Sequence, residues 1–213
     1  MYLNSPNQGS NPYYTCPCYE FCRQKLFNMP MKFTQSQVDL MNSLRMLWEQ
    51  HDVWTRATIV SLVFALPDVD FVTKRLLRNP ADFGQALRPY YGDRIASKFS
   101  DLLKNHLVIA ADLVKASKAG DNKAASEAEK KWYANADEIA AFLGSINPYW
   151  SEEDWRTMMH AHLSLVKAEA VNMLTKNYEA ATSVYDEIER QSLEMADTMA
   201  AGIINQSPYR FMQ

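Results

Sequence analysis

Residues 102–114 read LLKNHLVIAADLV, an apolar stretch with a histidine near its middle. Leu102, His106, Ile109 and Leu113 follow one another at spacings of three and four residues, which is the period of one face of an α-helix. This face is apolar except for the histidine. The stretch therefore predicts a helix that buries one face in a core, together with the imidazole of His106.

The same arrangement returns in residues 158–171, which read MMHAHLSLVKAEAV. Here the helical face runs through Met158, His162 and Glu169, so His162 takes the place that His106 has in the first stretch. A buried histidine that occurs twice has two interpretations. It is either a satisfied part of the core or part of a binding site.

Helical periods of the same kind continue in both directions along the chain, with Gly, Pro and Asn residues at the breaks. We expect long helices over about 34–66, 93–118, 122–146, 151–176 and 178–204. Thr34-x-x-Gln37 reads as a capping box at the start of the first one. Two short helices, over 68–78 and 80–88, are expected to form an insertion over one end of the molecule, between the first two long helices.

No segment shows the bounded alternation of apolar and polar residues that marks strands. Long helices with short connections predict an all-α fold, an antiparallel up-down bundle of four to five long helices. The count depends on Asn177, where the last two helices are either separate or one kinked helix. We expect an irregular arm over 1–32, a single bundle domain over 33–206 and a C-terminal tail over 207–213.

All three cysteines of the chain, Cys16, Cys18 and Cys22, lie in the arm, which is rich in Cys, Tyr, Asn and Pro. Their C-x-C-x3-C spacing is a weak zinc signal, because a closed zinc site normally takes four ligands. Free thiols and disulfides to another chain are the alternatives.

The composition excludes several classes of function. The net charge of −3 gives no basic surface for nucleic acid, and no glycine-rich phosphate loop occurs. The longest apolar run, residues 57–66, is too short to span a bilayer. The first residues lack the features of a signal peptide, so a cytoplasmic protein is expected.

The polar residues on the apolar faces point to a candidate metal site. At a rise of about 1.5 Å per residue, His51, His106, Asn135 and His162 fall at similar depths in an up-down bundle. Glu169 lies two turns from His162 on the same face. Imidazoles and carboxylates that project inward from facing helices hold metal ions in bundles. The sequence therefore predicts a candidate iron or zinc site made of His51, His106, His162 and Glu169, with Asn135 as their hydrogen-bonding neighbour.

Two observations favour the alternative, a structural role for these residues. The Glu-x-x-His pairs of di-iron bundles do not occur, and four histidines are fewer than the five of hemerythrin-like sites. Buried histidines are also commonly satisfied by hydrogen bonds within the core. The fourth histidine, His160, is expected to face outward beside Arg156 and Lys167.

From Leu47 onward the chain resembles a family of small, uncharacterised helical proteins of spore-forming bacteria, often labelled acetylglutamate kinase. The matching stretches are LWEQHDVWTR, LLRNPADFGQALRPYYG, WYANADEIAAFL, SINPYW and MADTMAAGI. The label implies an α/β fold with glycine-rich phosphate loops, which this sequence does not support. The resemblance implies a helical fold, a bacterial cytoplasm and an association with spores, and it supplies no catalytic residue.

Two functions compete at this point. The first is a non-enzymatic bundle that acts in stress or sporulation, by self-association into a homo-oligomer or by binding a protein partner. The second is a bundle that binds a metal or cofactor through its histidines. We find no kinase or hydrolase machinery in the sequence.

Overall fold

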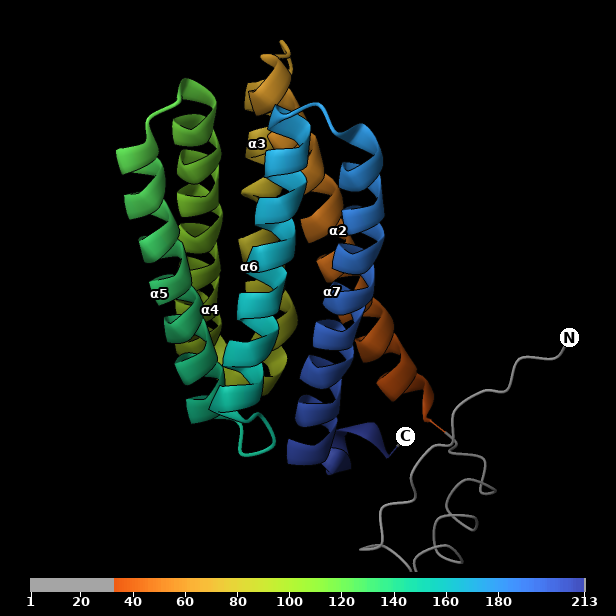
Figure 1. Ribbon diagram of the computed structural model, residues 1–213. Coiled ribbons are helices and arrows are strands. Elements are labelled where there is room, and N and C mark those ends of the chain that lie inside the picture. The colour runs from red at the N-terminus through yellow and green to blue at the C-terminus, as the bar shows by residue number, and fades with distance from the viewer. Residues whose placement is uncertain (1–32, 213) are drawn as a thin grey trace, which may run out of the picture. The chain divides into compact units, whose positions relative to one another are not determined.

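The computed structural model describes residues 33–212, and helices account for nearly all of them. No strand occurs among these residues, and five long helices pack against one another (Figure 1). The all-α bundle prediction is therefore confirmed. The arm predicted over 1–32, with its three cysteines, lies outside the described residues.

The first long helix, α2 (Gln35–Phe64), begins where the sequence predicts a capping box. Thr34 Oγ1 accepts a hydrogen bond from the backbone N–H of Gln37 at 3.3 Å, and Gln37 Oε1 accepts one from the Thr34 N–H at 3.0 Å. Two of the unpaired donors at the helix start are thereby satisfied. At the other end Ala65 adopts a left-handed conformation (φ 53), which stops the helix shortly before Pro67.

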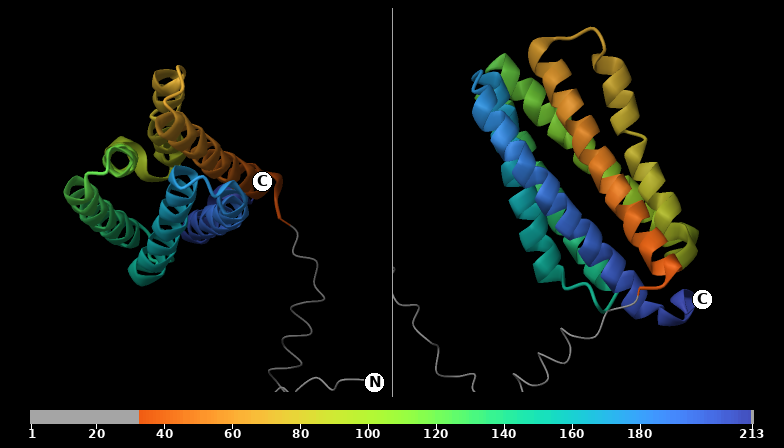
Figure 2. Two further views of the ribbon diagram at one scale, coloured as in Figure 1. Left: turned by 45° about the horizontal axis from the view of Figure 1, so that its top comes forward. Right: turned by 90° about the vertical axis from the view of Figure 1, so that its right-hand side faces the viewer.

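The segment after α2 differs from the expected insertion. α3 (Val69–Leu76) and the first part of α4 (Asn79–Ala119) do not cover one end of the bundle but run back along α2 (Figure 2). At Gly92 (φ 75, ψ 172) the helix is interrupted and the chain reverses, in a conformation open essentially to glycine alone. The second part of α4, residues 93–119, is therefore parallel to α2 and not antiparallel.

The two parts of α4 pack closely after this reversal. A Cβ added to Gly84 would lie 3.3 Å from the carbonyl oxygen of Ala96 and 3.4 Å from the Cβ of Ser100. The breaks at Pro67 and Gly92 are readable in the sequence, but a break does not specify the direction in which the next segment runs. This is why the expectation of an insertion over one end is wrong.

The remaining helices are α5 (Asn122–Ile146), α6 (Glu152–Leu174) and α7 (Tyr178–Gln206). Asp121, Ser151 and Asn177 cap their starts by accepting a hydrogen bond from a backbone N–H three residues later. α6 and α7 are separate helices, because Lys176 adopts a left-handed conformation (φ 62) between them. A 3-10 turn, η1 (Pro208–Phe211), follows α7.

The long helices close into a ring in which α2 contacts α7 and α4, α4 contacts α5, α5 contacts α6, and α6 contacts α7. α2, the second part of α4, and α6 run toward one end of the bundle, where Phe64 and Tyr178 lie with ring centroids 6.1 Å apart. We call this the Phe64 end. α5 and α7 run the other way (Figure 1).

The predicted depths hold despite the different chain direction. His51, His106 and His162 lie near the middle of their helices, so reversing a helix barely changes their level. All three imidazoles are buried in the core. None of the helices within residues 33–212 combines the length and the apolar character needed to cross a membrane.

Candidate metal centre

Three buried side chains offer metal ligands at one place in the core. His51 and Asp52 are neighbours on α2, and His162 faces them from α6. Their side chains are 3%, 2% and 2% exposed. One ligand atom from each residue lies within 4.8 Å of those from the other two, and the two imidazole centroids are 5.6 Å apart. This spacing allows a single cation to bind all three.

The orientation of His162 is fixed by an amide on α7. His162 Nδ1 donates a hydrogen bond to Gln191 Oε1 at 3.0 Å, and Gln191 Nε2 donates to the carbonyl oxygen of Met158 at 3.0 Å. Because the amide N–H is already used, Gln191 presents its oxygen to the ring. The proton of the neutral imidazole therefore stays on Nδ1, and the lone pair is on Nε2.

His51 is held by an equivalent device. Its Nδ1 lies 3.4 Å from Asn79 Oδ1, and Asn79 Nδ2 donates to the carbonyl oxygen of Leu47 at 2.9 Å. Asn79 is fully buried at the start of α4. A metal-binding histidine usually donates its other ring N–H to an oxygen, which sets the tautomer and the ring orientation. Both histidines have this arrangement.

Asp52 has one satisfied and one free carboxyl oxygen. Ser192 Oγ on α7 donates to Asp52 Oδ1 at 3.0 Å. Asp52 Oδ2 is buried and has no hydrogen-bond partner within residues 33–212. An unpaired buried carboxyl oxygen is costly, and a bound cation or proton relieves that cost.

Burial sets the protonation state of the group. Desolvation, together with the nearby imidazoles, lowers the pKa of His51 to about 3. Desolvation also lowers the pKa of His162 to about 4 and raises that of Asp52 to about 8. At neutral pH the imidazoles are therefore neutral and able to bind a metal. Asp52 carries a proton that a metal would displace.

His106 lies close to His51, Asp52 and His162, but neither of its ring nitrogens is free to bind a metal. His106 Nδ1 donates to Asn135 Oδ1 at 2.9 Å, and Trp132 Nε1 donates to His106 Nε2 at 3.0 Å. Asn135 Nδ2 in turn donates to the carbonyl oxygen of Leu102 at 3.3 Å. Both ring nitrogens of His106 are occupied, so the structure does not bring it into the cluster of ligands.

Glu169, the fourth predicted ligand, is also engaged elsewhere. Its carboxylate is 1% exposed and forms an ion pair with Arg56 Nη1, and the Arg56 guanidinium lies 4.6 Å from the ring centroid of Tyr185. Desolvation raises the pKa of Glu169 to about 7, although Arg56 opposes the shift. Glu169 is therefore a neighbour of the cluster of ligands and not a member of it.

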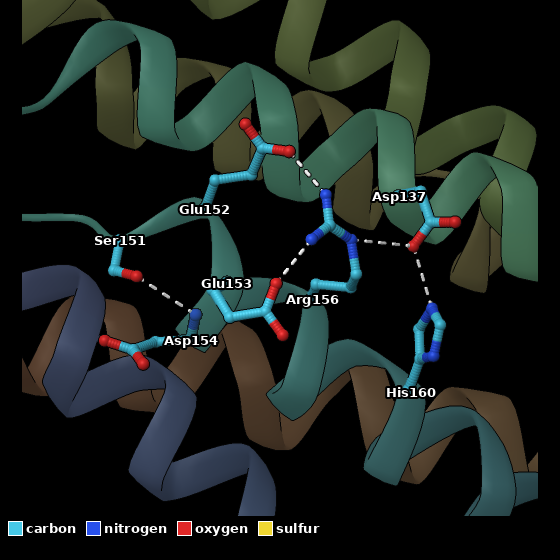
Figure 3. A network of polar contacts seen from close by, with 7 residues as sticks. All are labelled: Asp137, Ser151, Glu152, Glu153, Asp154, Arg156 and His160. Atoms are coloured by element: carbon cyan, nitrogen blue, oxygen red, sulfur yellow. Dashed lines mark hydrogen bonds and ion pairs between the residues drawn. The ribbon is translucent and has the colours of Figure 1, made fainter.

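His160 faces away from the core, as the sequence predicts. It is half-exposed on α6, where its Nε2 lies 2.8 Å from Asp137 Oδ1 of α5 (Figure 3). Arg156 joins the same carboxylate to Glu152 and Glu153 at the start of α6. The network links α5 to α6 at the surface and is separate from the buried histidines.

The sequence interpretation missed Asp52, Asn79 and Gln191. In the sequence Asp52 lies among Arg45, Glu49 and Arg56, and such a run of charged residues is typical of a solvated helix face. The position of Asp52 four residues after Trp48 is the signal that could have placed it on the buried face. No local pattern could have paired Asn79 with His51, because that contact depends on how the chain returns along α2.

No family model, curated protein or solved structure matches the chain. The resemblance to helical proteins of spore-forming bacteria therefore stays a prediction.

Proposed function

We propose that the protein binds one divalent transition-metal ion, iron(II) or zinc(II), through His51, Asp52 and His162. The observation that carries the proposal is Asp52 Oδ2, which has no partner within residues 33–212 and is buried beside two imidazoles whose Nδ1 atoms are already hydrogen-bonded. A buried carboxyl oxygen that lacks a partner within residues 33–212 is unfavourable unless something binds it. A cation can bind this oxygen and both imidazoles together.

The ligand types restrict the choice of ion. Two imidazoles and one carboxylate are the set found in non-haem iron(II) sites, and zinc(II) also accepts them. Calcium and magnesium prefer oxygen ligands alone, so they fit less well. With three protein ligands, at least one coordination position would stay open for water or another small molecule.

The experiment is a calorimetric titration of Zn(II) into metal-free protein. The wild type is expected to bind about one ion per chain, and Asp52→Asn to lose at least tenfold in affinity because the anionic ligand is gone. Glu169→Gln is the matched control, since it alters a buried carboxylate that pairs with Arg56 instead. Equal affinity in the wild type and Asp52→Asn would contradict the proposal.

Proton release gives a second reading from the same titration. Because burial raises the pKa of Asp52 to about 8, metal binding at pH 7 should release about one proton per chain. Comparing heats in two buffers with different ionisation enthalpies measures this number. A metal held by surface groups would release no proton from Asp52.

Self-association or binding of a protein partner is the second candidate function. It is supported by three exposed apolar side chains near the turn between α2 and α3. Phe64, Leu66 and Phe71 are 40%, 37% and 76% exposed. Large apolar side chains gathered at a surface are typical of contact sites. Light scattering of the wild type and of Phe71→Ser tests it, since a complex that depends on this surface would dissociate in the variant.

A further inference from the structure

A small apolar cavity begins next to the histidines and extends toward the Phe64 end. It has a volume of about 60 Å³ and lies between α2, α4 and α6, with Trp132 of α5 in its wall. Thr55 follows His51 by four residues on α2, Val166 follows His162 by four on α6, and both line the cavity. Because α2 and α6 run in the same direction, the cavity starts about one turn from the metal ligands.

Two hydroxyl groups in the cavity wall have no hydrogen-bond partner in the part of the chain that the structure describes. Thr55 Oγ1 and Thr58 Oγ1 are buried, and neither forms a hydrogen bond within residues 33–212. Both residues line the cavity, and Thr58 is 3% exposed. A buried threonine hydroxyl without a partner lowers stability, whereas a valine of the same shape would not. These hydroxyls are available to a molecule in the cavity.

The rest of the lining restricts the charge and the size of such a molecule. It is mostly aliphatic, and the ammonium of Lys167 is paired with Glu129 at 2.5 Å. A charged ligand would therefore lose its hydration without gaining a free counter-charge. The cavity is smaller than the engineered cavity of about 150 Å³ that holds benzene, and it is partly open at the surface, where its lining residue Val171 is 46% exposed. A short, thin chain can therefore enter it without being fully enclosed.

We propose that this cavity binds a small uncharged molecule with a short aliphatic chain and one hydroxyl or carbonyl group, held by Thr55 and Thr58. The chain would lie along Val166 and Ala170, and its polar group would be one turn from His51 and Asp52. That this molecule is a ligand or substrate of the metal centre rests on the proposed function. Its binding to the cavity does not.

The first test is a titration of metal-free protein with 1-butanol, followed by the methyl NMR signals of alanine, valine and leucine. We expect saturable shifts at Val166 and Ala170. Ala170→Leu, which fills the cavity, should weaken binding at least tenfold, and Ala168→Leu, which is half-buried on the same helix but outside the lining, should not. Butyrate has the same chain with a charge and should bind at least tenfold more weakly.

Thr58→Val keeps the proposal testable if Ala170→Leu does not fold. This variant should unfold at a higher temperature than the wild type, because an unpaired buried hydroxyl is removed. It should also bind 1-butanol roughly threefold to tenfold more weakly, the effect of one lost hydrogen bond. Unchanged binding in Thr58→Val, or no saturable shift in the wild type, would overturn the cavity proposal.

A second experiment distinguishes the cavity proposal from the proposal of a metal centre. In Co(II)-loaded protein, paramagnetic relaxation should broaden the 1-butanol signals, most strongly next to the hydroxyl group. Binding to metal-free protein without broadening would keep the cavity site but reject its link to the metal. Absence of Co(II) binding would reject the metal centre, and the titration of metal-free protein would still decide the cavity.

Discussion

His106 and His162 lie at one level of the same core, on helices that run in the same direction, yet their surroundings differ. Trp132 and Asn135 occupy both ring nitrogens of His106. Among the described residues, Gln191 bonds to Nδ1 of His162, and Nε2 has no hydrogen-bond partner. His106 therefore has no nitrogen left for a metal, whereas His162 keeps the lone pair of Nε2 available.

Two tryptophans show the difference most directly: Trp48 precedes His51 by three residues on α2, and Trp132 precedes Asn135 by three residues on α5. Trp132 donates its N–H to His106, whereas Trp48 Nε1 has no hydrogen-bond partner within residues 33–212 and its ring lies 6.2 Å from that of His162. His51 therefore has the position relative to Trp48 that Asn135 has relative to Trp132. His106 is a structural histidine because Asn135 and Trp132 both bond to it. His162 is a candidate ligand because His51 stands in place of an asparagine and the Trp48 N–H does not bond to the ring.

The largest expected effect comes from removing each histidine in turn. His106→Leu leaves the Trp132 N–H and the Asn135 oxygen buried without a partner, so we expect a loss of about 2–6 kcal/mol in the free energy of unfolding. His162→Leu leaves only the half-buried Gln191 amide, which can reach water, and should cost less than about 1.5 kcal/mol. Urea denaturation of metal-free protein measures both. Similar losses of stability in His106→Leu and His162→Leu would show that the two histidines do not differ in their surroundings.

Replacing Trp132 should destabilise the protein more than replacing Trp48. Trp132→Phe leaves His106 Nε2 unpaired, so it should cost about 1–3 kcal/mol more than Trp48→Phe, which removes an N–H that has no partner. The loss of ring volume is the same in both variants, so the difference isolates the hydrogen bond. Thermal unfolding of the pair checks it, and a more severe effect of Trp48→Phe would reverse the comparison.

The amide bonded to His162 should affect metal affinity, and the amide bonded to His106 should not. Gln191→Leu removes the group that orients His162 and is expected to lower Zn(II) affinity roughly 10- to 100-fold. Asn135→Leu alters the corresponding partner of His106 and should leave the affinity of the folded protein unchanged. Competition with a coloured chelator gives both constants. A loss of affinity in Asn135→Leu would mean that His106 takes part in binding.

The pH dependence of stability should show the buried groups directly. His51, His106 and His162 have pKa values of about 3, 3 and 4, lowered from 6.5, so below pH 6.5 the unfolded chain binds more protons and stability falls on acidification. Asp52 is raised from 3.8 to about 8, so the unfolded chain loses its proton first and stability falls as pH rises toward 8. We therefore expect a maximum near pH 6.5.

Asp52→Asn sharpens this prediction. Above pH 6.5 the wild type should lose up to about 1.4 kcal/mol of stability for each pH unit through this one group, and the variant should lose less. Chemical denaturation of metal-free protein between pH 6.5 and 8 measures the two slopes. Parallel slopes would show that Asp52 titrates normally in the folded protein.

The fold was predictable from the sequence to the level of its helices. Periodicity, the capping box at Thr34 and the breaks at Gly120 and Asn147 place most helix ends, because these signals are local. The path of residues 68–92 was not predictable, because the direction after a break depends on packing. The depth estimate succeeded because residues at mid-helix keep their level in either direction.

The candidate site was only partly predictable. Burial of His51, His106, His162 and Glu169 follows from their place on apolar helical faces. Which of them keep a free lone pair depends on hydrogen bonds between residues far apart in the chain, such as Trp132 with His106 and Arg56 with Glu169. Helical periodicity carries no information about those pairs.

The most direct test is the metal content of protein purified without a histidine tag, measured by mass spectrometry for the wild type, His162→Gln and His106→Gln. Glutamine keeps a polar side chain at each position, so the two variants are matched. We expect about one iron or zinc ion per wild-type chain, an unchanged content in folded His106→Gln and almost none in His162→Gln. Equal metal content in all three proteins, or none in the wild type supplied with both metals, would contradict the assignment of His162 as a metal ligand and of His106 as a structural residue.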